Sequence, residues 1–190
     1  LAVDLARLVD EVAPPALAGL RQNFVPGGVE IVAFGRTFVG DLLSGLDLVD
    51  RVIVSDDRRM FGREAHAIVC DLRRERFDMA LLFPNSFRTA VLAWRVRIPR
   101  RIGFARDGRS WLLTDRIRPR SRRVPNPVLD EYLRLAAHLG CETTSREMHL
   151  ATTAADHQQL DAFWRTQPDW LRARPYVCLN PGGAFGAGKH

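Results

Sequence analysis

The chain has 190 residues, of which 46% are hydrophobic and 26% charged, a balance typical of a globular protein and not of a disordered or fibrous one. The formal net charge at pH 7 is +6, and arginine carries almost all of the positive charge because Lys189 is the only lysine. No apolar run approaches the roughly 20 residues that a membrane-spanning helix needs, so we expect no transmembrane segment.

Short apolar runs alternate along the chain with stretches of helical period. This alternation predicts an α/β fold, a Rossmann-like parallel sheet with helices on both faces. The apolar runs predict strands at residues 29–34, 51–54, 79–83 and 101–104. The run at 79–83 is unbroken, which indicates a strand that is buried on both faces.

Helices are predicted between these strands, where apolar residues recur every three or four positions. One begins near Phe38, another runs from Ala65 to about Phe77, and a third is capped by Ser86. The third has an expected inner stripe of Phe87, Val91 and Trp94.

The pattern is lost between Arg106 and Val124, so we expect a long excursion from the sheet there. A helix then follows, with Asn126 as its cap, Pro127 at its first position and Gly140 just past its end. A further helix has Leu160, Phe163 and Trp164 on one side.

The two ends of the chain are both expected to be incomplete. No apolar run is recognisable in residues 1–10, so the first strand is expected to lie outside the chain. We expect an N-terminal Rossmann-like lobe at 1–152, a connector helix and linker at 153–174, and the first strand of a truncated second lobe at 175–190.

Neither a disulfide framework nor a metal site is indicated. Cys70, Cys141 and Cys178 lie far apart, with no Cys-x-x-Cys pair, and are expected to be buried thiols. The five histidines are not spaced as metal ligands, so we expect no bound metal.

A glycine-rich segment, Asn-Pro-Gly-Gly-Ala-Phe-Gly-Ala-Gly-Lys, follows the last predicted strand and ends at Lys189. Such a loop lets backbone N–H groups approach a phosphate, and a nearby ammonium neutralises its charge. It is not a Walker loop, because His190 occupies the position of the required hydroxyl. A flexible hinge is the alternative interpretation.

Four sequence blocks resemble glycosyltransferase family 9, the bacterial heptosyltransferases of lipopolysaccharide inner-core synthesis, and are most similar to the heptosyltransferase II type. They are Leu-Phe-Pro-Asn-Ser-Phe-Arg-Thr at 82–89, Ala-Trp at 93–94 with Ile-Pro-Arg-Arg-Ile-Gly-Phe at 98–104, Leu-Thr-Asp at 113–115, and the glycine-rich segment at 180–189. The resemblance implies an inverting, metal-independent glycosyltransferase of the two-lobed GT-B type, with a nucleotide sugar as its donor substrate and no cofactor. It would transfer heptose from ADP-heptose to the lipid A-linked inner core, in the cytoplasm and peripherally at the inner face of the inner membrane.

The resemblance also implies residue roles. The donor nucleotide sugar would contact Asn180, Gly182, Gly183 and Lys189 in the second lobe. The acceptor would contact Asn85, Ser86, Arg88 and Arg101 in the first lobe. For Asn85 and Ser86 the alternative is a helix cap, and for Arg88 a solvated helix side chain.

Asp10 is the candidate general base, since an aspartate in this region of the family can take the proton of the acceptor hydroxyl. Here Val9 stands where the family has glycine, so a surface carboxylate is the alternative for Asp10.

Two other function classes are alternatives. One is a non-catalytic Rossmann-like module that binds an anionic glycolipid or a protein partner. The other, nucleic-acid binding through the arginine clusters at 97–106 and 116–123, lacks a recognisable motif, so we expect no nucleic-acid partner.

Overall fold

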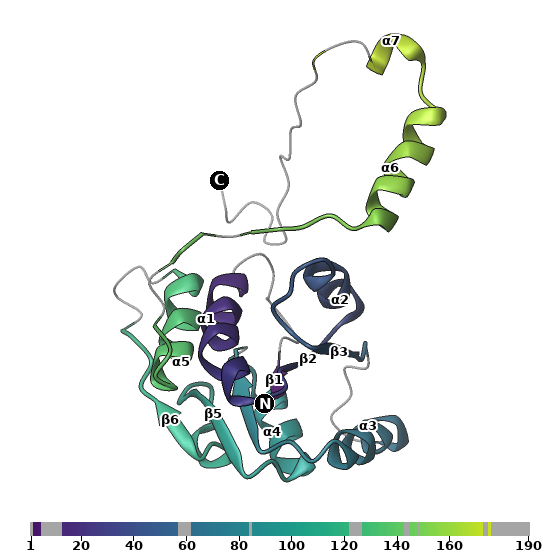
Figure 1. Ribbon diagram of the computed structural model, residues 1–190. Helices are drawn as coiled ribbons and strands as arrows, with labels where there is room; N and C mark the ends of the chain where they lie inside the picture. Colours follow the sequence, from purple (N-terminus) through teal and green to yellow (C-terminus); the bar gives the residue numbers. More distant parts are fainter. Residues whose placement is uncertain are drawn as a thin grey trace. The chain divides into compact units, whose positions relative to one another are not determined.

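The computed structural model describes residues 2–4, 13–56, 62–83, 85–121, 127–142, 145–147, 149–172 and 175. The chain divides into two compact units, Leu1–Ala151 and Thr152–His190. The first unit holds a parallel sheet with helices around it, and the second holds two helices (Figure 1). None of the helices in the described ranges is long and apolar enough to cross a bilayer.

The first unit is built on a six-stranded sheet in the order β3-β2-β1-β4-β5-β6, in which every neighbouring pair is parallel. This is the strand order of a doubly wound Rossmann fold. The strands are β1 (Ala2–Asp4), β2 (Val32–Gly35), β3 (Arg51–Val54), β4 (Met79–Leu82), β5 (Arg100–Phe104) and β6 (Asp115–Ile117). The predicted fold class is therefore confirmed.

Strand β1 corrects the expectation that the first strand lies outside the chain. Ala2 pairs with Val32 of β2 and with Ala80 of β4, so β1 lies at the centre of the sheet. The strand has only three residues, Ala-Val-Asp, which is too short to form a recognisable apolar run. The strand is held in the sheet by pairing with β2 and β4, and such long-range pairing leaves no local sequence pattern.

Strand β6 corrects the expectation of an excursion between Arg106 and Val124. Asp115–Ile117 pairs with β5 at the edge of the sheet, with Ile102 opposite Asp115. Two of its three residues are charged, so the segment has no strand-like apolar pattern. Ile117 nevertheless contributes to the core.

Helices cover both faces of the sheet in the first unit (Figure 1). Two short 3-10 helices are η1 (Val25–Gly27) and η2 (Ser110–Leu112). The α-helices of this unit are α1 (Pro14–Phe24), α2 (Thr37–Leu43), α3 (Arg63–Arg74), α4 (Phe87–Val96) and α5 (Val128–His138). Helices α1, α2 and α5 share one core cluster, and α3 and α4 share the other.

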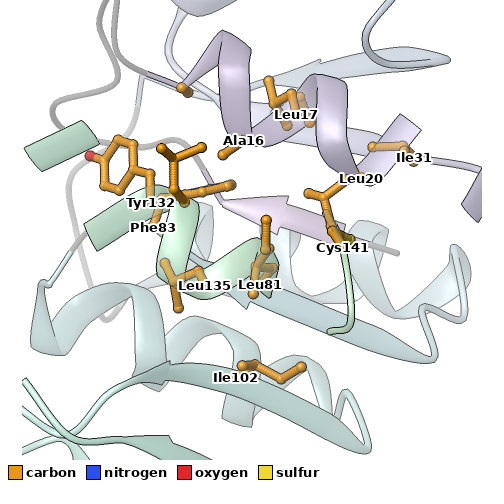
Figure 2. Close-up of a cluster of buried hydrophobic side chains, with 14 of the residues drawn as sticks. Ala16, Leu17, Leu20, Ile31, Leu81, Phe83, Ile102, Tyr132, Leu135 and Cys141 are labelled. Carbon is orange, nitrogen blue, oxygen red and sulfur yellow. The ribbon is translucent and has the colours of Figure 1, made fainter. Parts of the chain in front are cut away.

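The strands divide their side chains between these two clusters by alternation. Leu81 and Phe83 of the β4 segment pack with α1 and α5, whereas Ala80 and Leu82 pack with α3 and α4. Figure 2 shows the first cluster, in which Leu17 and Leu20 of α1 lie above the sheet together with Tyr132 and Leu135 of α5. The rings of Phe83 and Tyr132 meet edge to face at 4.8 Å. Burial on both faces explains the unbroken apolar run of β4.

The inner face of α4 differs from the predicted stripe. Val91 is buried as predicted, but Phe87 and Trp94 are 37% and 50% exposed. The buried positions are mostly small, including Ala90 and Ala93. A helix that packs closely on a sheet needs small side chains at the contact, so the large aromatic residues lie on its outer side.

Helix α5 agrees closely with its predicted boundaries. Pro127 is its N-cap, so the helix begins one position later than predicted, and Gly140 just past its end has a positive φ of 84° that favours glycine. Asn126 lies outside the described residues. Of the three cysteines, Cys141 is buried and Cys70 is half-buried, while Cys178 is also outside the described residues.

The second unit contains α6 (Ala154–Arg165) and α7 (Asp169–Arg172). A capping box begins α6, because the Thr153 hydroxyl accepts from the Asp156 N–H and the Asp156 carboxylate accepts from the Thr153 N–H. The predicted side of this helix is not buried within the unit: Leu160 and Phe163 are 50% and 52% exposed. The strand expected at the start of the second lobe, within 175–190, falls on residues outside the described ranges.

Candidate active site

The order of strands reverses between β1 and β4, and in open parallel sheets this is the point where the carboxyl ends of the strands form a ligand crevice. Asn85 and Ser86 follow β4 at this edge, and Arg106 and Arg109 follow β5. Glu131, from the first turn of α5, reaches the same place. Polar side chains from three segments far apart in the sequence therefore gather at the carboxyl edge.

Ser86 caps α4, as predicted. Its hydroxyl oxygen accepts a hydrogen bond from the Thr89 N–H at 3.2 Å, which satisfies one of the free donors of the first turn. The Ser86 carbonyl accepts from the Thr89 hydroxyl at 2.9 Å and from Arg109 Nη1 at 3.2 Å. Ser86 thus fixes the start of α4 at the carboxyl edge.

Arg109 is fully buried and holds this region together. Its Nε donates to the Phe104 carbonyl at 3.1 Å, and its Nη2 donates to Asn85 Oδ1 at 3.0 Å. Nη1 lies 3.4 Å from the Thr89 hydroxyl, in addition to its bond with Ser86. A buried guanidinium is tolerated only when its donors are satisfied, so these contacts explain why a charge can lie in this interior.

Sequence reasoning missed Arg109, although Gly103 offered one signal. A Cβ atom at Gly103 would lie 3.2 Å from Arg109 Nη2, so the absence of a side chain leaves room for the guanidinium. Gly103 belongs to one of the sequence blocks described above, and its close approach to Arg109 gives that glycine a physical role.

Asn85 connects Arg109 to a buried carboxylate. Its Oδ1 accepts from Arg109 and its Nδ2 donates to Glu131 Oε2 at 3.3 Å. Glu131 is 6% exposed and also lies 3.4 Å from Arg106 Nη2. The Asn85 amide is therefore held in one orientation between the Arg109 guanidinium and the Glu131 carboxylate. It bridges these two opposite buried charges, so each has a hydrogen-bond partner.

A second polar group lies at the same edge, after β2 and β3. The Asp56 carboxylate accepts from the hydroxyl and the N–H of Thr37, and Arg36 Nε lies 3.5 Å away. The hydrogen bond from the Thr37 hydroxyl is the main cause that lowers the pKa of Asp56. This carboxylate is therefore ionised at neutral pH.

The other two residues predicted to contact the acceptor lie elsewhere. Arg88 is half-buried in the first turn of α4 and lines a small hollow with Phe34 and Ala65, on the side that faces α3. Arg101 pairs with Ala80 at the amino-terminal part of β5, about 10 Å along the sheet from the carboxyl edge. The structure therefore does not bring Arg101 together with Asn85 and Ser86.

Arg101 instead holds a neighbouring loop. Its Nε donates to the Leu112 carbonyl at 2.7 Å, and its Nη1 donates to the Ile98 carbonyl. Its backbone N–H also donates to the Thr114 hydroxyl at 2.7 Å. The bonds to Leu112 and Thr114 connect β5 to the segment around η2.

Asp10, Asn180, Gly182, Gly183 and Lys189 lie outside the described residues, so their roles stay predictions. In the described ranges, no group of three or more His, Cys, Asp and Glu side chains is placed to share a metal ion.

The sequence of residues 65–190 matches the family model described as glycosyltransferase family 9 (heptosyltransferase). The chain belongs to glycosyltransferase family 9. The family match covers Asn85, Arg109 and Glu131, and it begins within α3. The predicted family is therefore confirmed.

Similarity to individual family 9 proteins is low in sequence and clear in fold. Lipopolysaccharide heptosyltransferase 2 of Escherichia coli (strain K12) is 27% identical over 121 residues, which are 62% of this chain and 34% of that protein. The crystal structure of a family 9 glycosyltransferase from Veillonella parvula gives a TM-score of 0.69 at 20% identity, over 88% of this chain and 49% of that one. The structure of the E. coli ADP-heptose lps heptosyltransferase II gives a TM-score of 0.65 at 17% identity, over 88% of this chain and 51% of that one. The chain thus spans about a third of the length of the curated relatives it matches and about half of these solved structures.

Proposed function

We propose that the protein is a glycosyltransferase that transfers heptose from ADP-heptose to the lipid A-linked inner core of lipopolysaccharide. The observation that carries this proposal is the family 9 match over residues 65–190, together with relatives that are named heptosyltransferase 2. The donor is proposed by analogy with the similar E. coli structure, an ADP-heptose lps heptosyltransferase II. The proposed architecture is the two-lobed GT-B type, in which the sheet of the first unit forms the acceptor-binding lobe.

The carboxyl edge supplies the features that an acceptor with anionic sugars requires. Arg106 is 23% exposed at its side chain, so its guanidinium is partly open to solvent beside Asn85 and Glu131. The buried Arg109 keeps Asn85 and the start of α4 in fixed positions. Pre-positioned polar groups at a crevice lower the entropic cost of orienting a substrate. In this proposal Asn85 and Ser86 shape the acceptor site.

The proposed reaction is an inverting transfer. A carboxylate takes the proton of the acceptor hydroxyl while the hydroxyl oxygen forms the new bond to the heptose anomeric carbon. The bond between that carbon and the ADP oxygen breaks, and ADP leaves with the electron pair. Asp10 is proposed as the base. Strand β1 ends at Asp4, beside the switch point, and Asp10 follows six residues later in the sequence. Lys189, with Asn180, Gly182 and Gly183, is proposed to hold the donor diphosphate without a metal ion.

The test is a transfer assay with purified protein, ADP-heptose and a lipopolysaccharide that lacks heptose. We expect heptose incorporation in the unmodified protein and a decrease in kcat of about 100-fold or more for Asp10→Asn, the usual range for loss of a general base. Asp71→Asn is a matched control, because that carboxylate is 68% exposed on α3. No incorporation with any nucleotide heptose, in a protein that still binds the acceptor, would favour the non-catalytic binding module instead.

A further inference from the structure

Three exposed aromatic side chains form a continuous group on the outer side of α4 and η2. Phe87, Trp94 and Trp111 are 37%, 50% and 63% exposed. The ring centroids of Phe87 and Trp111 are 6.2 Å apart, and those of Trp94 and Trp111 are 6.4 Å apart. We name these three residues the aromatic surface. Soluble proteins rarely expose contiguous groups of large aromatic residues, so we expect this surface to bind a partner.

A groove of about 310 Å³ lies at the carboxyl-terminal ends of α3 and α4. Its apolar part includes Phe77 and Ile98, and its charged part is Arg73, Arg76, Arg97 and Asp78. Three cations and one anion leave the groove positive. We name it the arginine groove. Figure 1 shows α3 and α4 next to each other, and η2 contacts α4, so both features belong to the layer on one face of the sheet.

Two of these arginines have an unusual backbone. Arg76 and Arg97 follow α3 and α4 with φ values of 54° and 67°, in the left-handed region that favours glycine at the end of a helix. Within the described residues, the structure gives neither guanidinium a hydrogen bond or an ion pair. The third, Arg73, donates to the Arg95 carbonyl at 3.0 and 2.6 Å. Arg76 and Arg97 thus place long cationic side chains at two backbone positions whose left-handed conformation glycine adopts at lower cost.

We propose that the aromatic surface and the arginine groove together bind an anionic lipid bilayer. Aromatic rings partition to the boundary between headgroups and acyl chains, and guanidinium groups bind lipid phosphates. Arg97 caps the carboxyl end of α4 three residues after Trp94, and both side chains are exposed, so a ring and a cation can reach the same interface. The positive charge of the groove favours an anionic surface over a neutral one, and this complementarity selects the occupant. The choice of a bilayer also agrees with the lipid-anchored acceptor of the proposed function.

The experiment is vesicle binding in the absence of nucleotide sugar, so that its result is independent of heptosyl transfer. Flotation is measured with vesicles of phosphatidylethanolamine and phosphatidylglycerol, and with neutral phosphatidylcholine vesicles. We expect binding to the anionic vesicles only, weakened by added salt. The double variant Trp94→Ser/Trp111→Ser should bind at least tenfold more weakly. Arg97→Gln should bind about fivefold more weakly, the usual effect of one cation near such a surface.

Matched controls come from the second unit. Trp170→Ser removes a tryptophan that is 60% exposed, and Arg165→Gln removes an exposed cation of α6. Both should bind the vesicles as the unmodified protein does. Unchanged far-ultraviolet circular dichroism shows that each variant is folded. Equal binding of all variants, equal binding to neutral vesicles, or no vesicle binding would overturn the proposal. So would a dimer in analytical ultracentrifugation that dissociates in the double tryptophan variant, because a second copy would then occupy the surface.

Discussion

The buried guanidinium of Arg109 provides a demanding test of the site, because one side chain joins segments that follow β4 and β5. Arg109→Met keeps much of the aliphatic volume and removes the charge and the donors. The Phe104 carbonyl, the Asn85 amide oxygen, the Ser86 carbonyl and the Thr89 hydroxyl would each lose a donor. The change therefore isolates the contribution of hydrogen bonding and charge.

The expected loss follows from the burial of these partners. A buried polar group without its partner costs about 1–3 kcal/mol. Breaking a buried charged network costs about 3–5 kcal/mol. Ser86 also accepts from the Thr89 hydroxyl, so its carbonyl keeps one donor. We therefore expect the free energy of unfolding to decrease by about 3 kcal/mol, a large part of the 5–15 kcal/mol of a typical domain.

The assay is urea-induced unfolding monitored by circular dichroism. The free energies of unfolding are compared between variants whose dependence of that free energy on urea concentration is unchanged. Arg118→Met is the control, because that side chain is exposed and its loss should change stability by less than about 0.5 kcal/mol. A double-mutant cycle of Asn85→Ala with Arg109→Met should give a coupling energy of about 1–3 kcal/mol. A loss below about 1 kcal/mol for Arg109→Met, or a coupling near zero, would refute the account of this network.

Two further predictions concern an ion pair and a glycine. The hydrogen bond from Arg21 lowers the pKa of Asp50, so this carboxylate stabilises the fold above its ordinary pKa of 3.8 and the effect is lost as pH falls through the lowered value. Asp50→Asn should therefore lower Tm at pH 7, and the difference from the unmodified protein should shrink as pH falls below 3.8; a difference that does not change with pH would contradict this. Gly103→Ala should destabilise by about 1–3 kcal/mol because its Cβ would lie 3.2 Å from Arg109 Nη2, whereas Gly27→Ala, in open space, should be nearly neutral in the same urea assay.

Local sequence patterns were sufficient for the parts of the fold that are stabilised locally. The unbroken apolar run at 79–83 predicted β4, and Ser86 predicted the start of α4, because burial on two faces and helix capping both leave a signal within a few residues. Strands β1 and β6 have three residues each and gain their stability from neighbouring strands. Such pairing is a property of the assembled sheet and leaves no periodic pattern.

The same distinction applies to the site. Asn85 and Ser86 were found at the carboxyl edge because they directly follow a predicted strand. The family resemblance implies an acceptor contact for Arg101 through the block at 98–104, but the direction of β5 puts this residue toward the other end of the sheet. Arg109 could not be predicted, since its acceptors lie between 5 and 24 residues away in the sequence and meet only in the folded chain.

The central position of β1 has a consequence for how the domain assembles. Within the strands that the structure describes, hydrogen bonds connect the β2–β3 half of the sheet to the β4–β6 half only through Ala2–Asp4. These residues leave the ribosome before their partners, and Ala2 must wait for Val32 and then for Ala80. Closing a chain segment of that length is entropically costly and slows folding. Strand β1 is therefore expected to dock late during synthesis, between two half-sheets that have already formed.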